Sequence, residues 1–231
     1  FLLGNLDGFD EAERLPLAEM PELELWVLHR LSELDELTRK SCADFDFHRL
    51  YVALGNFCTN DLSAFYLDIR KDALYCDDAA SIRRRAARTV LDQVFSCLTA
   101  WLAPILCFTA EEAWQARFPD DDSVHLRQFP EIPDDWHNRE VADRWAKVRT
   151  LRRVVTGALE VERKEKRIGA SLQGHPTVYA PGEYLAALDG LDAAEICITS
   201  GISLVEGAVP AGAFTVEDVA DIGVVVELAK G

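Results

Sequence analysis

The segment "DFHRLYVALGNFCTNDLSAFYLDIR", residues 46–70, carries the most regular apolar pattern of the chain. Large apolar side chains recur in it every three or four residues, the spacing that places them on one face of an α-helix. The stripe consists of Phe47, Leu50, Tyr51, Leu54, Cys58, Leu62, Phe65 and Ile69. It predicts a long helix that Asp46 caps at its start and whose last turn carries the cations Arg70 and Lys71. We expect both cations to project into solvent.

Similar patterns predict other helices on both sides of this segment. One apolar stripe spans residues 23–42, and another spans residues 81–103, before a proline that a regular helix interior would not tolerate. Thr109 and Glu112 have the spacing of a capping box, in which two side chains satisfy backbone groups at the start of a helix. They predict a short helix over residues 109–117. These helices together indicate a helical bundle.

The composition changes after this bundle. Residues 119–137 contain three prolines and many acidic residues, which is typical of a linker, so the first domain should span residues 1–118. A long junction helix over residues 138–170 is expected next, with its cations exposed. Its predicted buried face consists of Val141, Trp145, Val148, Val155 and Leu159. The fold class is therefore mainly α, a helical bundle followed by a junction helix and a small α+β module at residues 171–231.

Within the predicted α+β module, three short runs rich in β-branched residues indicate strands. They are "PTVYA" (176–180), "AEICITS" (194–200) and "GVVVELA" (223–229). The segment "GEYLAAL" (182–188), which lies between the first two, indicates a brief helix.

Length and composition exclude several classes of protein. The chain has 231 residues, of which 49% are hydrophobic, so it can fill a core and is not a disordered protein. It contains no run of about 18 uncharged apolar residues that could span a bilayer, so we expect no membrane partner and a cytoplasmic location. The start at Phe1 without a methionine suggests an excised fragment.

Residue types that carry metal or catalytic chemistry are present, but their spacing is unfavourable. Six cysteines are spread along the chain, and we expect them to be reduced thiols of the core. No histidine lies beside a cysteine at a spacing typical of zinc ligands, so no metal site is predicted. Asp46 and His48 are close in sequence, but helix positions two apart face different directions. No nucleotide-binding or nucleophile motif occurs, so we predict no catalytic residue.

The charge is distributed unevenly. The net charge is −16, yet residues 139–170 hold ten Lys or Arg against five Asp or Glu, whereas residues 171–231 hold one against nine. The local balance of charge matters more than the net charge of the chain, because electrostatic fields in physiological salt decay over about 8 Å. Four basic clusters result: Arg70 and Lys71; Arg83, Arg84, Arg85 and Arg88; Lys147, Arg149, Arg152 and Arg153; and Arg163, Lys164, Lys166 and Arg167.

These clusters predict a surface that binds nucleic acid. Lys and Arg neutralise phosphates and position a nucleic acid without reading its sequence. Solvated helix faces or intramolecular ion pairs would explain each cluster taken alone. Base recognition would also need stacking or edge contacts, for which Tyr75, Trp114 and Trp136 are candidates near predicted loops.

Five blocks of the sequence resemble one family. They are "FLLGNLDGFD", "DFHRLYVALGNFCTNDLSAFYLDIRKDALY", "RRRAARTVL", "LAPILCFTAEEAW" and "RIGASLQGHPTVYA". Together they resemble the C-terminal part of bacterial isoleucyl-tRNA synthetases, and the resemblance covers essentially the whole chain. Several blocks are shared with the valyl and leucyl enzymes, so the anticodon-binding domain of one of these is the alternative within the same class.

The resemblance implies a helical-bundle anticodon-binding domain that is followed by elements also serving tRNA recognition. The expected partners are an isoleucine-accepting tRNA and the catalytic and editing domains of the same polypeptide. The family's HIGH and KMSKS motifs are absent from this sequence, so no catalysis and no cofactor are expected here; ATP and Mg²⁺ would be used by the parent enzyme. The cysteine-rich zinc-binding tail of bacterial members is also missing. A rival of another class is a helical protein-interaction module whose acidic C-terminal unit docks a protein.

Overall fold

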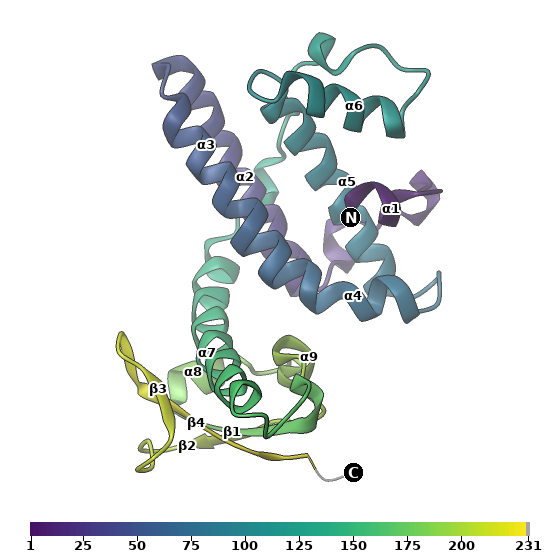
Figure 1. Cartoon of the computed structure of the whole chain (residues 1–231). Coiled ribbons are helices and arrows are strands. Elements are labelled where there is room, and N and C mark those ends of the chain that lie inside the picture. Colours follow the sequence, from purple (N-terminus) through teal and green to yellow (C-terminus); the bar gives the residue numbers. More distant parts are fainter. Residues whose placement is uncertain (230–231) are drawn as a thin grey trace. The chain divides into compact units, whose positions relative to one another are not determined.

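A computed structural model describes residues 1–229, and in it the chain forms two compact units (Figure 1). The first unit spans Phe1–Val141 and the second begins at Ala142. The boundary lies inside a helix, and residues 119–137 belong to the first unit. None of the helices in the described residues is long and apolar enough to cross a membrane.

The first unit is a bundle of helices, in which the three longest stretches run up, down and up (Figure 1). Its elements are α1 (Leu2–Leu6), η1 (Glu11–Glu13), η2 (Leu17–Glu19), α2 (Glu22–Asp44), α3 (Phe47–Asn56), η3 (Phe57–Tyr66), α4 (Leu67–Cys76), α5 (Ile82–Leu102), α6 (Cys107–Arg117), η4 (Val124–Leu126) and η5 (Asp134–Trp136). The element η3 is π-helical, and the other η elements are 3₁₀ turns.

The predicted helix over residues 46–70 is confirmed as the continuous stretch α3, η3 and α4. Asp46 caps it, because its carboxylate accepts the backbone N–H of Arg49 at 3.1 Å. The helix continues to Cys76, however, so the prediction that Arg70 and Lys71 form its last turn is wrong.

The apolar stripe predicted for this helix is only partly buried. Leu50, Leu54 and Phe65 lie in the core as predicted, whereas Phe47 and Tyr51 are exposed. The sequence pattern was therefore wrong for two of its aromatic members.

The helices predicted at residues 23–42 and 81–103 are confirmed as α2 and α5. The predicted capping box at Thr109 and Glu112 is wrong, because α6 already begins at Cys107 and Thr109 lies in its first turn. The neighbouring carboxylate of Glu111 instead accepts hydrogen bonds from the segment that follows α6, from Ser123 Oγ and from the Val124 N–H, each at 2.9 Å.

The segment 119–137 packs on the first unit through specific polar contacts. The Arg39 guanidinium donates to the Pro130 carbonyl at 2.8 Å, and η5 lies against α2. Directly after η5, the Asn138 N–H donates to Nδ1 of the buried His29 at 3.0 Å. These contacts attach the chain between α6 and α7 to the bundle.

The second unit places α7 (Arg139–Lys164), most of which belongs to this unit, against a four-stranded sheet. Its other elements are η6 (Ser171–Gln173), β1 (Gly174–Ala180), α8 (Gly182–Ala186), α9 (Ala193–Cys197), β2 (Ser203–Glu206), β3 (Phe214–Val216) and β4 (Val219–Leu228). The strand order is β2-β1-β4-β3, with β1 and β2 parallel and the other pairs antiparallel. Val178 pairs with Leu204 on one side and with Val224 on the other.

Most predictions for this unit hold. All five apolar residues of the predicted junction helix are buried, and "PTVYA" and "GVVVELA" lie in β1 and β4. The segment "AEICITS" is not a strand, because Asp192 caps the short helix α9 by accepting the Glu195 N–H at 3.0 Å. Strands β2 and β3 were not predicted; they are short edge strands, and β2 is largely exposed.

The cysteines are all free thiols, but they are not all in the core. Cys97 and Cys197 are buried, and burial raises the pKa of each thiol to about 12. Cys76 and Cys107 are exposed, so the prediction of core thiols is wrong for these two.

Candidate nucleic-acid interface

Arg70, the first predicted phosphate contact, lies inside the bundle. Its Nε and Nη2 donate to the two carboxylate oxygens of Glu24 on α2 at 2.7 and 2.8 Å, and the side chain is only 6% exposed. The Tyr66 hydroxyl donates to the same carboxylate at 3.1 Å, and burial together with the negative charge of Glu24 raises the pKa of Tyr66 well above its ordinary value. The expectation that Arg70 projects into solvent is therefore wrong.

Lys71, by contrast, is exposed on α4. Its ammonium lies 3.1 Å from the Asp68 carboxylate, one helical turn away. Exposed ion pairs of this kind contribute little to stability, so a phosphate can replace the carboxylate at small cost. Lys71 is accessible to a polyanion, whereas its neighbour Arg70 is not.

The first two arginines of the α5 cluster hold the turn that precedes α5. Arg83 donates to the Asp77 carboxylate at 2.8 Å and holds the pKa of that carboxyl below its ordinary value. Arg84 donates to the Asp77 backbone carbonyl, also at 2.8 Å. Both guanidinium groups therefore fix the path of the chain between α4 and α5.

The other two arginines of this cluster contact η1 and the residue that follows α1. Arg85 donates to the Glu13 carbonyl and Arg88 to the Asp7 carbonyl, each at 3.1 Å. Arg88 Nε also lies 3.1 Å from the Glu13 carboxylate. The α5 cluster is thus largely engaged in contacts within the first unit.

The cations in the middle of α7 contact the rest of the second unit. Arg152 donates to the Ile196 carbonyl at the end of α9 at 2.8 Å, and Arg149 is half-buried on the same helix. Lys147 pairs with Glu183 at 2.7 Å. Arg153 pairs with Asp218 at 2.6 Å, and both of these side chains are more than half exposed. Arg153 is the most accessible cation of this cluster.

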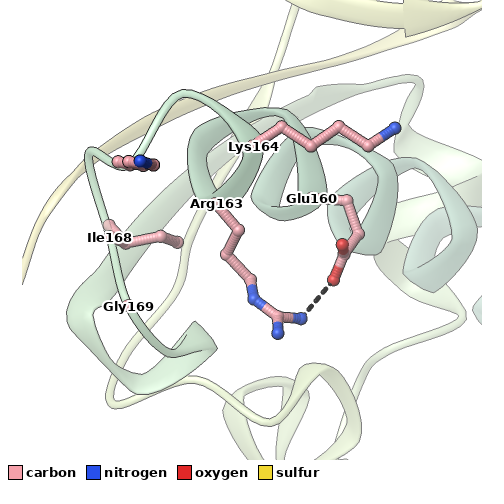
Figure 2. Close-up of a pocket in the computed structure, with 6 residues that line it drawn as sticks. Glu160, Arg163, Lys164, Ile168 and Gly169 are labelled. Carbon is pink, nitrogen blue, oxygen red and sulfur yellow. Dashed lines mark hydrogen bonds and ion pairs between the residues drawn. The ribbon is translucent and has the colours of Figure 1, made fainter.

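Three of the four cations of the fourth cluster line a hollow of about 490 Å³ at the carboxyl end of α7 (Figure 2). The lining residues are Glu160, Arg163, Lys164, Lys166, Ile168 and Gly169. Arg163 and Glu160, one turn apart on α7, point toward each other and form an ion pair. No carboxylate in the described part of the chain pairs with Lys164 or Lys166, and both side chains are exposed.

The turn after α7 explains why these cations gather. Lys166 adopts the left-handed conformation, with φ of 59°, which ends the helix and reverses the chain. The Arg167 N–H then donates to the Glu162 carbonyl at 3.0 Å, and the Arg167 side chain pairs with Glu162 and Glu165. Of the four predicted clusters, as far as the structure describes them, this one keeps two cations without a carboxylate partner beside one hollow.

The comparison with known proteins decides the family. The family described as anticodon-binding domain of tRNA ligase matches residues 24–178, about two thirds of the chain. The chain belongs to this family.

Relatives of this anticodon-binding domain are isoleucine–tRNA ligases. The ligase of Brucella abortus biovar 1 (strain 9-941) is 54% identical, that of Agrobacterium fabrum 53% and that of Bartonella henselae 48%, each over 232 aligned residues. Each alignment covers the whole of this chain and 24% of the relative, so the chain spans about a quarter of their length. The resemblance to isoleucyl-tRNA synthetases is confirmed.

The aromatic candidates of this anticodon-binding domain differ in exposure. Tyr75 is 65% exposed beside Phe1, with ring centroids 6.3 Å apart. Trp136 is half-buried. Trp114 is buried, and its indole N–H donates to the Asp122 carbonyl at 3.0 Å, so it is not available for stacking.

Sequence reasoning overlooked Arg49, which is exposed on the first turn of α3. Arg49 is a single cation within an apolar stripe, and it belongs to none of the four basic clusters. The one signal in the sequence was its place three residues after the predicted cap Asp46. Metal ligands are not grouped in this domain: within residues 1–229, no three His, Cys, Asp or Glu side chains could hold one ion.

Proposed function

We propose that this domain binds the anticodon arm of an isoleucine-accepting tRNA, as part of a longer cytoplasmic polypeptide that ligates isoleucine to that tRNA. Ligation, with ATP and Mg²⁺, and editing would take place in domains outside these residues. The family match supports tRNA binding, and the isoleucine–tRNA ligase relatives support the choice of amino acid. The catalytic and editing domains would be this domain's partners within the polypeptide.

The observation that carries the proposal is the basic hollow at the end of α7. Lys164 and Lys166 are exposed there without a carboxylate partner among the described residues, and Arg163 lines the same hollow. A phosphate that enters this hollow releases counterions from the RNA without breaking any ion pair of the two lysines. Lys71 and Arg153 are secondary candidates, because a phosphate must first displace an accessible carboxylate from each. Arg167 is less available, since it pairs with two carboxylates, of which that of Glu162 is largely buried.

The test is a filter-binding titration of this chain with transcripts of isoleucine and valine tRNAs at several salt concentrations. The double change Lys164→Ala and Lys166→Ala is expected to weaken binding of both tRNAs alike. It should also lower the salt slope by about 2, because each lysine that is removed accounts for one phosphate contact. Lys40→Ala is the matched control, since Lys40 is an exposed lysine that pairs with Asp44 at 2.7 Å in the first unit. An unchanged slope in the double variant removes the hollow from the tRNA footprint.

The rival function, a protein-interaction module, rests on the acidity of residues 171–231. Both functions predict a stable, folded chain, but only tRNA binding predicts retention of the transcript at low salt. A chain that retains neither tRNA at low salt and instead forms a stable complex with a protein would favour the rival.

A further inference from the structure

Asp35 and Thr38 on α2 and Trp101 on α5 each bury a polar atom that has no hydrogen-bond partner within the described residues. The atoms are Asp35 Oδ1, the Thr38 hydroxyl and the Trp101 indole Nε1. Asp35 is 8% exposed, and the other two residues are fully buried. Buried polar atoms are almost always hydrogen-bonded, either to protein groups or to ordered water. These three atoms therefore call for a partner that the chain itself does not supply.

The packing of the two helices brings these atoms together. α2 and α5 pack against each other and run in the same direction, because the chain reverses before α3 and again after α4 (Figure 1). Burial first, and then the negative charge of Asp35, raises the pKa of the Cys97 thiol on α5 to about 12, so Asp35 lies near Cys97. Thr38 follows Asp35 by about one turn, and Trp101 follows Cys97 by one turn. The Thr38 hydroxyl and the Trp101 indole thus lie at the same level of the interface.

The chemistry of the three atoms suits a water molecule. The carboxylate oxygen of Asp35 only accepts a hydrogen bond, the indole N–H of Trp101 only donates one, and the hydroxyl of Thr38 can do either. None of them bonds directly to another. A water molecule can accept from the indole and donate to the carboxylate at the same time, and a buried water typically makes about three hydrogen bonds.

The Asp35 carboxylate is already held in place by its other oxygen. Oδ2 accepts the Arg39 Nε–H at 2.7 Å, and Arg39 Nη2 donates to the Pro130 carbonyl at 2.8 Å. The buried oxygen, Oδ1, is therefore fixed in position by a partner near the surface. A water bound to Oδ1 would join α5, through Asp35 and Arg39, to the segment that follows α6.

We propose that one long-lived water molecule binds between α2 and α5, where it accepts a hydrogen bond from the Trp101 indole and donates to Asp35 Oδ1 and to the Thr38 hydroxyl. The water replaces a direct polar contact between the two helices and fixes how they pack. This site lies in the interior of the first unit, and its existence does not depend on tRNA binding.

The first test counts the long-lived waters of the whole chain by oxygen-17 magnetic relaxation dispersion. The double variant Thr38→Val and Trp101→Phe removes two of the three partners, and the count should fall by about one, since a buried water needs roughly two to four polar partners. Thr99→Val is the matched control, because the hydroxyl of this buried threonine donates to the Phe95 carbonyl at 2.7 Å; the count should stay as it is. An unchanged count in the double variant, or an equal fall in the control, overturns the proposal.

The second test locates the water in the unchanged chain, so it does not depend on whether the double variant folds. The Trp101 indole proton should show NOE and ROE cross-peaks of opposite sign at the water frequency, as a long-lived water gives and proton exchange does not. The Trp114 indole, which donates to the Asp122 carbonyl at 3.0 Å, is the internal control and should show none. The absence of cross-peaks at Trp101 refutes the site. Cross-peaks without any change of the water count in the double variant would come from the Thr38 hydroxyl and refute it as well.

Discussion

Glu24 of α2 and Arg70 of α4 form a buried ion pair in which two guanidinium nitrogens donate to the two carboxylate oxygens, at 2.7 and 2.8 Å. The two residues lie 46 positions apart in the sequence. Neither partner has access to enough water to remain charged alone, so the pair fixes how the two helices meet. A cation that sequence reasoning placed in the RNA interface thus joins two helices of the bundle.

Replacing Arg70 alone should destabilise the first unit strongly. Arg70→Met leaves the Glu24 carboxylate buried without its counter-charge, and breaking a buried pair in this way costs about 3–5 kcal/mol. The measurement is the free energy of unfolding in urea. Lys71→Ala, next in sequence but exposed, should change it by less than about 0.5 kcal/mol.

A double variant tests whether the cost comes from the unpaired charge. Glu24→Gln in the Arg70→Met background removes the carboxylate but leaves an oxygen that can accept from the Tyr66 hydroxyl. Most of the lost stability should return. If the double variant is as unstable as Arg70→Met alone, packing and not charge is the reason for the loss.

The stability of the first unit should fall in mild acid because of His29. Its Nδ1 accepts the Asn138 N–H at 3.0 Å, and burial lowers the pKa of the imidazole below the ordinary value of 6.5. The facing groups are Glu33, whose Oε1 lies 3.4 Å from Nε2, the ring of His137 at 4.9 Å, and Arg30. The folded state therefore favours the neutral ring despite the nearby carboxylate.

The sign of the pH effect follows from this depressed pKa. Below pH 6.5 the unfolded chain binds a proton that folded His29 does not, so stability is lost as the pH falls, by at most about 1.4 kcal/mol per pH unit. Urea unfolding at pH 7.5 and pH 5.5 measures the difference, which should shrink in His29→Gln. His48→Gln, a change at an exposed histidine, is the control and should leave the difference as it is. An equal effect of both variants would contradict the role of His29.

Two helical glycines should respond in opposite directions to a larger side chain. Gly55 in α3 has open space around it, so Gly55→Ala should raise the free energy of unfolding by about 1 kcal/mol through helix propensity alone. At Gly157 in α7 an added Cβ would lie 2.8 Å from Cε1 of Phe214 on β3. Gly157→Val should therefore displace that ring and lower the stability of the second unit by about 1–3 kcal/mol. A stabilising Gly157→Val would show that β3 adapts freely.

The sequence predicted the helices well because their apolar residues repeat with one period over many turns. The stripe of residues 46–70 located the helix and its cap Asp46, but it could not reveal η3, since a π-helical turn leaves no signature in the spacing of apolar residues. The stripe also placed Phe47 and Tyr51 in the core, although both lie in α3, before η3, and are exposed.

The candidate site was harder to predict than the fold, because composition does not reveal the partner of a charge. Arg83 and Arg84 appear in the sequence as part of a basic run, yet both contact Asp77. Lys164 and Lys166 look the same in the sequence, but in the structure neither pairs with a carboxylate of the described residues. Whether a cation pairs with a carboxylate depends on tertiary contacts. The sequence could therefore identify the four basic clusters, but it could not show which of them is accessible to RNA.

Glu160 is the one carboxylate that lines the basic hollow in the described part of the chain, and neutralising it should strengthen tRNA binding. Glu160→Gln releases Arg163 from its ion pair and removes a negative charge that would repel a phosphate. The affinity for a tRNA transcript at low salt should rise, and the salt slope should grow by about 1, as expected for one more phosphate contact. Glu183→Gln is the matched control, since it releases Lys147 on the same helix but away from the hollow. An equal gain from both changes would mean that the tRNA responds to net charge and not to this hollow.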